Sequence, residues 1–108
     1  MKLVTAQRED ALIVRVTGDV DHHSAPGLRE AIDEKMESLS PREIILDLSG
    51  TDFMDSSGLG LILGRLRKTR ERGIRLTLFH PTPAIRKILH LAGVEESLNI
   101  VMRKEEEQ

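Results

Sequence analysis

Apolar and polar residues alternate along the first part of the chain, in the pattern typical of β-strands. Residues 2–8 and 11–17 both alternate loosely, with Glu9-Asp10 between them, which predicts two strands joined as a hairpin. Gly18 is expected to end the second strand. Residues 19–23 would then form a loop that leads into a helix.

Further along, the apolar spacing switches several times between helical and strand-like. The run over residues 43–48 is almost continuous in Ile and Leu, which predicts a strand covered on both faces. Residues 49–52 are expected to turn, because small and polar residues follow one another there. The other predicted elements are helices from Ser24 to Leu39, Ser57 to Arg72 and Thr82 to Ala92, and strands over 74–79 and 98–102. Ser24 and Thr82 are the expected N-caps.

The order of these elements is ββαβαβαβ. Strands that alternate with helices imply a largely parallel sheet with right-handed crossovers, and the opening hairpin makes that sheet mixed. We therefore expect one α/β domain over residues 1–102, with a mostly parallel sheet of about five strands. Residues 103–108 are charged and are predicted to form a tail.

Composition narrows the class of protein. The chain has 108 residues, of which 39% are hydrophobic and 31% charged, and its net charge is -2. The near-neutral charge and the presence of only two aromatic residues argue against a nucleic-acid partner. The chain has no Cys, and no apolar run approaches the roughly 18 residues of a membrane span. These features predict a cytoplasmic protein without a membrane anchor. We also expect a monomer that needs no cofactor.

The stretch Asp55-Ser56-Ser57-Gly58 lies where a predicted strand leads into a helix. Ligands of open α/β sheets gather at such places, and a helix N-terminus favours an anion there. A phosphate carried by a serine would suit this position. The simpler interpretation is that Asp55 and the serines only cap the helix. Gly58 and Gly60 lower helix propensity, which suggests close approach of either a neighbouring strand or a partner.

Three other kinds of site are poorly supported. His22 and His23 are adjacent, so their side chains diverge, and the ligand spacing of a metal site is missing. The nucleophile-elbow pattern of serine hydrolases is also absent, because neither Ser56 nor Ser57 has a glycine two residues before it. The basic run over residues 65–72 is typical of a solvated helix face, although it could also meet an acidic patch on a partner or a nucleotide phosphate. As a nucleic-acid site it lacks a second basic element.

The motif over residues 53–68, FMDSSGLGLILGRLRK, resembles that of STAS domains, and of the bacterial anti-sigma factor antagonists in particular. Upstream, Asp47-Leu48 and the segment from Gly18 to His23 carry the same resemblance. The segment Asp21-His22-His23-Ser24-Ala25 is most similar to the sporulation branch, which antagonises the anti-sigma-F factor. The resemblance extends from the first hairpin to Met102. Members of the family often carry a further C-terminal helix.

This resemblance implies a protein switch that is not an enzyme. In the family, the serine after the aspartate is phosphorylated by an anti-sigma factor that is a serine kinase, and here that residue is Ser56. The unphosphorylated form binds the anti-sigma factor and frees the sigma factor, phosphorylation blocks this binding, and a serine phosphatase restores it. The residues expected to contact the partner are Asp21, His22, His23, Met54, Asp55, Ser57, Gly58, Leu59, Gly60 and Arg65.

Two alternatives remain open at the level of sequence. The same helix N-terminus could bind a nucleotide or another anion, which would make the chain a ligand-binding regulatory module. The chain could also serve a general stress-response circuit in place of sporulation.

Overall fold

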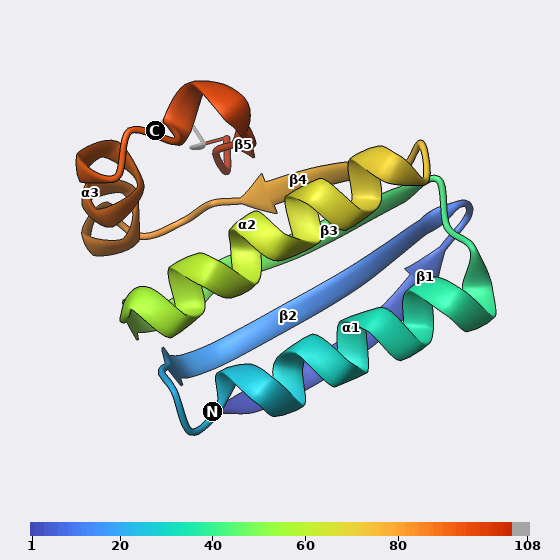
Figure 1. Ribbon diagram of the computed structural model, residues 1–108, viewed down its shortest axis with the longest axis horizontal. Helices are drawn as coiled ribbons and strands as arrows, with labels where there is room; N and C mark the ends of the chain where they lie inside the picture. Colours follow the sequence, from blue (N-terminus) through green and yellow to red (C-terminus); the bar gives the residue numbers. More distant parts are fainter. Residues whose placement is uncertain (105–108) are drawn as a thin grey trace.

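The computed structural model describes residues 1–104 and arranges them as a five-stranded sheet with helices packed on it (Figure 1). The strands lie in the order β1-β2-β3-β4-β5; β1 pairs antiparallel with β2, and the other neighbours are parallel. This confirms the predicted mixed, mostly parallel α/β fold. The elements are β1 (Lys2–Arg8), β2 (Ala11–Val20), α1 (Ala25–Leu39), β3 (Glu43–Met54), α2 (Ser56–Glu71), β4 (Arg75–Phe79), α3 (Pro83–Leu91), a 3₁₀ turn η1 (Glu95–Ser97) and β5 (Asn99–Val101).

The helices α1 and α2 lie side by side across one face of the sheet (Figure 1). The central strands direct every second side chain toward them, and the buried residues on this face include Leu12, Val14, Val16, Ile44, Leu46 and Leu48. On the opposite face of β3, Ile45 and Asp47 are only half-buried. The prediction that β3 is covered on both faces is therefore wrong. In the sequence, the apolar run Ile44-Ile45-Leu46 conceals the alternation between buried and half-buried positions. This alternation becomes visible only at the polar residue Asp47.

Both central strands are longer than predicted. Strand β2 continues through Gly18, which has a φ of 98°, and ends at Val20. Strand β3 continues through residues 49–52 to Met54, so no turn forms there. Turn-forming residues are accommodated because parallel pairing with β2 satisfies their backbone, with register shifts that mark bulges. The two strands consequently end together, with Val20 paired to Met54.

The observed helix ends lie within one residue of the predicted ends, and one cap differs from the prediction. Thr82 caps α3 by accepting a hydrogen bond from the Ile85 N–H at 3.4 Å, as predicted. Ser24 stands at the N-cap position of α1, but its hydroxyl bonds the preceding loop and leaves the helix N–H groups uncapped. Helix α2 begins at Ser56, one residue earlier than expected, and Gly73 follows its end with a φ of 69°.

Ion pairs join the two helices that cover the sheet. Arg65 and Lys68 of α2 lie 3.2 and 3.4 Å from the carboxylate of Asp33 on α1. Arg72 pairs with Glu37, and this pairing lowers the pKa of the Glu37 carboxyl. These contacts link the C-terminal halves of α1 and α2.

The predicted C-terminal tail and the predicted absence of a membrane span are the remaining expectations about the fold. Arg103 and Lys104 have no secondary structure, and the rest of the predicted tail, residues 105–108, lies outside the described residues. Within residues 1–104 no helix combines the length and the apolar character needed to cross a bilayer.

Candidate functional site

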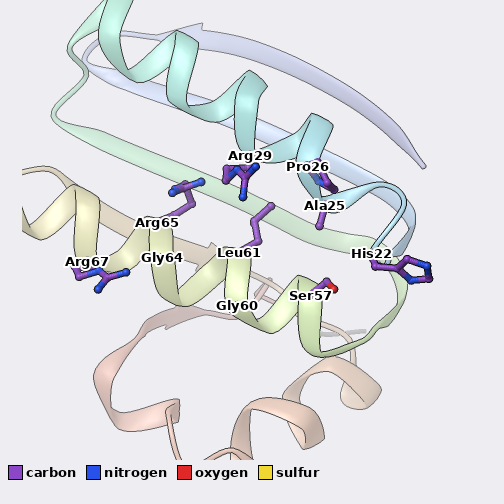
Figure 2. A pocket seen from close by; sticks show the side chains of 10 residues that line it. All are labelled: His22, Ala25, Pro26, Arg29, Ser57, Gly60, Leu61, Gly64, Arg65 and Arg67. Carbon is purple, nitrogen blue, oxygen red and sulfur yellow. The ribbon is translucent and has the colours of Figure 1, made fainter.

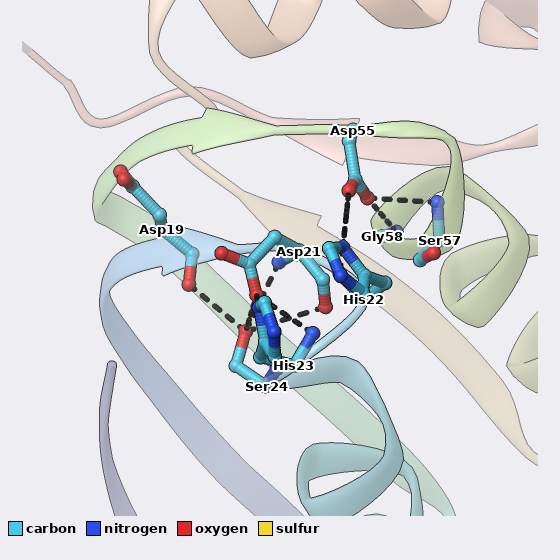
Figure 3. A network of polar contacts seen from close by, with 8 residues as sticks. All are labelled: Asp19, Asp21, His22, His23, Ser24, Asp55, Ser57 and Gly58. Carbon is cyan, nitrogen blue, oxygen red and sulfur yellow. Dashed lines mark hydrogen bonds and ion pairs between the residues drawn. The ribbon is translucent and has the colours of Figure 1, made fainter.

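The site forms where β2 and β3 end and α2 begins. The Asp55 N–H donates to the Val20 carbonyl at 3.2 Å, which joins the ends of the two strands. The Asp55 side chain turns back over the first turn of α2, where Oδ1 accepts from the N–H groups of Ser57 and Gly58 at 2.8 and 3.2 Å (Figure 3). Asp55 is therefore the N-cap of α2, and Ser56 is the first helical residue.

The second oxygen of Asp55 ties this junction to the loop before α1. Oδ2 accepts from the His22 N–H at 3.2 Å (Figure 3). His22 Nδ1 lies 3.9 Å from the same oxygen, at a largely exposed position. One carboxylate thus fixes two loops that are 33 residues apart in sequence. The histidine loop therefore lies beside the start of α2, where the two serines are.

Asp21 is held by its own loop. Its Oδ1 accepts from the N–H groups of His23 and Ser24 at 2.9 and 3.1 Å, while its backbone N–H donates to the Ser24 hydroxyl at 3.0 Å. The backbone hydrogen bonds from Ser24 and His23 stabilise the carboxylate and lower the pKa of Asp21. Asp21 therefore shapes the loop, and the exposed imidazoles of His22 and His23 form its outer surface. Their ring centres are 4.0 Å apart, so the expectation that these two side chains diverge is wrong.

The two serines differ in exposure. The Ser56 residue is exposed, whereas Ser57 is half-buried and lines a groove between α1 and α2. This groove has a volume of about 440 Å³ (Figure 2). Its lining residues are His22, Ala25, Pro26, Arg29, Ser57, Gly60, Leu61, Gly64, Arg65 and Arg67.

The glycines of α2 separate into two kinds. A Cβ added to Gly58 would overlap Met54 Cγ and would lie 2.9 Å from the Val20 carbonyl oxygen. Gly58 therefore lets the first turn of α2 pack on the strand ends. A Cβ added to Gly60 would meet no heavy atom within 4 Å, so packing inside the fold does not require a glycine there.

The predicted contact residues occupy different depths. His22, His23, Ser57, Leu59 and Gly60 are exposed or half-buried around the junction. Met54 is only 2% exposed, and the Arg65 side chain 11%, with Arg65 directed at Asp33. Met54, Gly58 and Arg65 thus support the surface from below.

Some groove residues are absent from the predicted contacts. Gly64 and Arg67 follow Gly60 at helical spacing, so the sequence contains a signal for their shared face. Pro26 and Arg29 belong to α1, and only the packing of α1 beside α2 brings them to the groove. No sequence pattern points to that pairing.

Asp55→Ala is expected to destabilise the protein by about 2 kcal/mol, because it removes both the helix cap and the bond to His22. Asp55→Asn keeps an oxygen that can cap α2, but the NH₂ group that replaces Oδ2 is a donor and cannot accept from the His22 N–H. Thermal unfolding and amide hydrogen exchange measure the two effects separately. Asp55→Asn should speed exchange at His22 and leave Ser57 protected.

Thr82→Ala is the matched control, because it removes the cap of another helix. It should lower the stability and leave exchange at His22 unchanged. Equal exchange rates of the His22 amide in Asp55→Asn and in wild type would contradict the hydrogen bond from the His22 N–H to Asp55 Oδ2.

Comparison with known proteins identifies the family of this chain. A family model described as the STAS domain matches residues 2–107. The chain belongs to the STAS domain family. The sequence resemblance to STAS domains is thereby confirmed.

Relatives of this STAS domain carry regulatory names. An anti-sigma F factor antagonist of Paenibacillus polymyxa is 36% identical over 83 residues, which cover 77% of this chain and 71% of the relative. An anti-sigma F factor antagonist of Lysinibacillus sphaericus is 35% identical over 85 residues, covering 79% and 73%. The family therefore has a regulatory role that is not enzymatic.

Solved structures agree with this assignment. The unphosphorylated form of the anti-sigma factor antagonist SpoIIAA has a TM-score of 0.73 and 26% identity, covering 97% of this chain and 90% of that one. The phosphorylated form of SpoIIAA, a Bacillus cell fate determinant, has a TM-score of 0.77 and 28% identity, covering 96% and 93%. The STAS domain described here thus resembles a protein known in both states.

Proposed function

We propose that this STAS domain is an anti-sigma factor antagonist that is controlled by phosphorylation of Ser56. In its unphosphorylated form it binds an anti-sigma factor in the cytoplasm and releases a sigma factor. The names of the anti-sigma F factor antagonists at 35 and 36% identity support this role. The paired histidines of the loop before α1, which resemble the sporulation branch, favour a sporulation circuit over a stress-response circuit.

The observation that carries the proposal is the exposed Ser56 at the start of α2. Asp55 already accepts from the Ser57 and Gly58 N–H groups. A phosphate on Ser56 would therefore remain on the surface, beside a carboxylate, and would not displace the cap. It would add about -1.5 to -2 charges at the place where a partner docks.

This arrangement suits a substrate of a kinase. The kinase is the anti-sigma factor itself, and a serine phosphatase returns the protein to its binding-competent form. The backbone around Ser56 is held by the Asp55 cap in both states, so phosphorylation changes the charge of the surface and leaves the fold intact. The partner senses that charge.

Incubation with the anti-sigma factor of the same organism and ATP tests the proposal. Mass spectrometry of the intact protein and of its peptides should find one phosphate, on Ser56. Ser56→Ala should take up none, whereas Ser57→Ala should be modified as wild type is. A phosphate on another residue, or none on the wild type, would show the assignment to be incorrect.

A further inference from the structure

The groove between α1 and α2 extends the junction away from Ser56. Ser57 and His22 line one end of it, and Gly60, Leu61 and Gly64 lie along α2 (Figure 2). Arg29 of α1 and Arg65 of α2 both lie between the two helices, at the side of the groove (Figure 2). The groove is therefore continuous with the proposed docking surface and differs from it in charge.

The glycines along α2 leave a flat surface that the fold itself does not use. A Cβ added to Gly60 or to Gly64 would find no heavy atom within 4 Å. Each glycine costs a helix interior roughly 1 kcal/mol relative to alanine. The two glycines are four positions apart, so the bare strip is about 6 Å long. Such a strip permits a second backbone to lie close to α2.

Three arginines surround this strip, and no acidic residue lines it among residues 1–104. Arg29 and Arg67 are exposed and form no ion pair within the described part of the chain. Arg65 is 9% exposed, and its Nε and Nη1 find no hydrogen-bond partner in that same part, although Asp33 Oδ1 lies 3.2 Å from Nε. The contact with Asp33 is thus an ion pair with poor hydrogen-bond alignment. Positive charge remains available to an anion in the groove.

We propose that this groove receives an acidic segment of the anti-sigma factor, with the backbone of the segment lying over Gly60 and Gly64. Carboxylates of the segment meet Arg29 and Arg67 at the rim. The inference rests on the proposed function and assigns a second, basic part of the docking surface. A phosphate on Ser56, at the same end as Ser57, repels an acidic segment and so weakens this contact too.

The shape of the groove distinguishes a polypeptide from a small anion. A single phosphate group needs positive charge at one point, which the arginines alone would supply. The bare strip from Gly60 to Gly64 adds room along a full turn of helix, beyond what one phosphate occupies. Close backbone approach together with a basic rim fits an acidic chain segment.

Titration of the unphosphorylated STAS domain with the anti-sigma factor of the same organism, without nucleotide and with ADP, tests this inference. Gly64→Ala should weaken binding about tenfold, because the methyl group occupies the strip. It should also raise the Tm by about 4 °C, since alanine favours the helix. The double variant Arg29→Ala/Arg67→Ala should weaken binding by about tenfold or more, and added salt should narrow its difference from wild type.

Gly27→Ala and Arg8→Ala are the matched controls. Gly27 lies in α1 outside the groove, and its added Cβ also meets nothing within 4 Å, while Arg8 lies at the far end of the sheet. Both should bind as wild type does. Absence of wild-type binding would overturn the proposed function, whereas normal binding by both groove variants would overturn only the groove. Weakening seen only with ADP would overturn the acidic segment and assign the groove to nucleotide phosphates.

Discussion

Ser56→Asp is expected to bind the anti-sigma factor about a hundredfold more weakly than wild type, whereas Ser56→Ala should bind normally. Asp55 already occupies the N–H groups of Ser57 and Gly58, so a new carboxylate at position 56 finds no partner on α2. It stays at the surface beside Asp55, where like charges accumulate. Isothermal titration calorimetry with each variant measures the difference.

A charge control separates a local effect from a change in net charge. Gln7→Glu adds one negative charge on β1, close to the hairpin that pairs with the start of β3. This is the opposite end of the sheet from α2's first turn, so binding should stay within a factor of about two. Equal affinities for Ser56→Asp and Ser56→Ala would contradict the electrostatic mechanism.

The order of elements was predictable because local patterns encode it. Alternation around Glu9-Asp10 indicates the hairpin, and the cap at Thr82 marks the start of α3 correctly. The ends of β2 and β3 were not predictable in the same way. Gly18 and residues 49–52 have turn-like side chains, but each strand supplies backbone partners for the other, and this tertiary pairing overrides local preference.

The candidate site shows the same division between local and tertiary information. The sequence indicates Asp55 as a cap, since an aspartate before a helix has a standard role. It contains no sign that the same carboxylate bonds His22, or that Arg29 faces α2. It also cannot separate Arg65, which lies against Asp33, from the exposed Arg67, because both are basic residues on one helix. Depth within the fold decides their roles.

The two carboxylate oxygens of Asp55 explain how the surface around Ser56 can keep its structure when a phosphate is added. Oδ1 holds the helix, and Oδ2 holds the loop before α1. Neither contact involves the Ser56 hydroxyl. Phosphorylation can therefore change the charge that the partner meets without releasing the start of α2 or the loop before α1. Gly58 supports this arrangement by letting α2 pack closely on the strand ends.

Gly58→Ala is expected to destabilise the protein by about 2 kcal/mol, with a fall in Tm of about 10 °C. The added methyl group would overlap Met54 Cγ and would lie 2.9 Å from the Val20 carbonyl oxygen. Met54 is buried and the carbonyl belongs to the backbone, so neither can move away freely. Val20 also accepts the Asp55 N–H, and a displaced carbonyl would weaken that bond. Thermal and urea unfolding followed by circular dichroism measure the loss.

Gly60→Ala in the same helix is the matched control, because its methyl group would meet no atom within 4 Å. It should stabilise the protein by about 1 kcal/mol through helix propensity alone. The two variants make the same chemical change two residues apart, so opposite signs can come only from what surrounds each position. A stabilised Gly58→Ala would mean that the strand ends tolerate the methyl group and that close packing does not explain this glycine. The expected opposite signs would separate the glycine that builds the junction from the one left open to a partner.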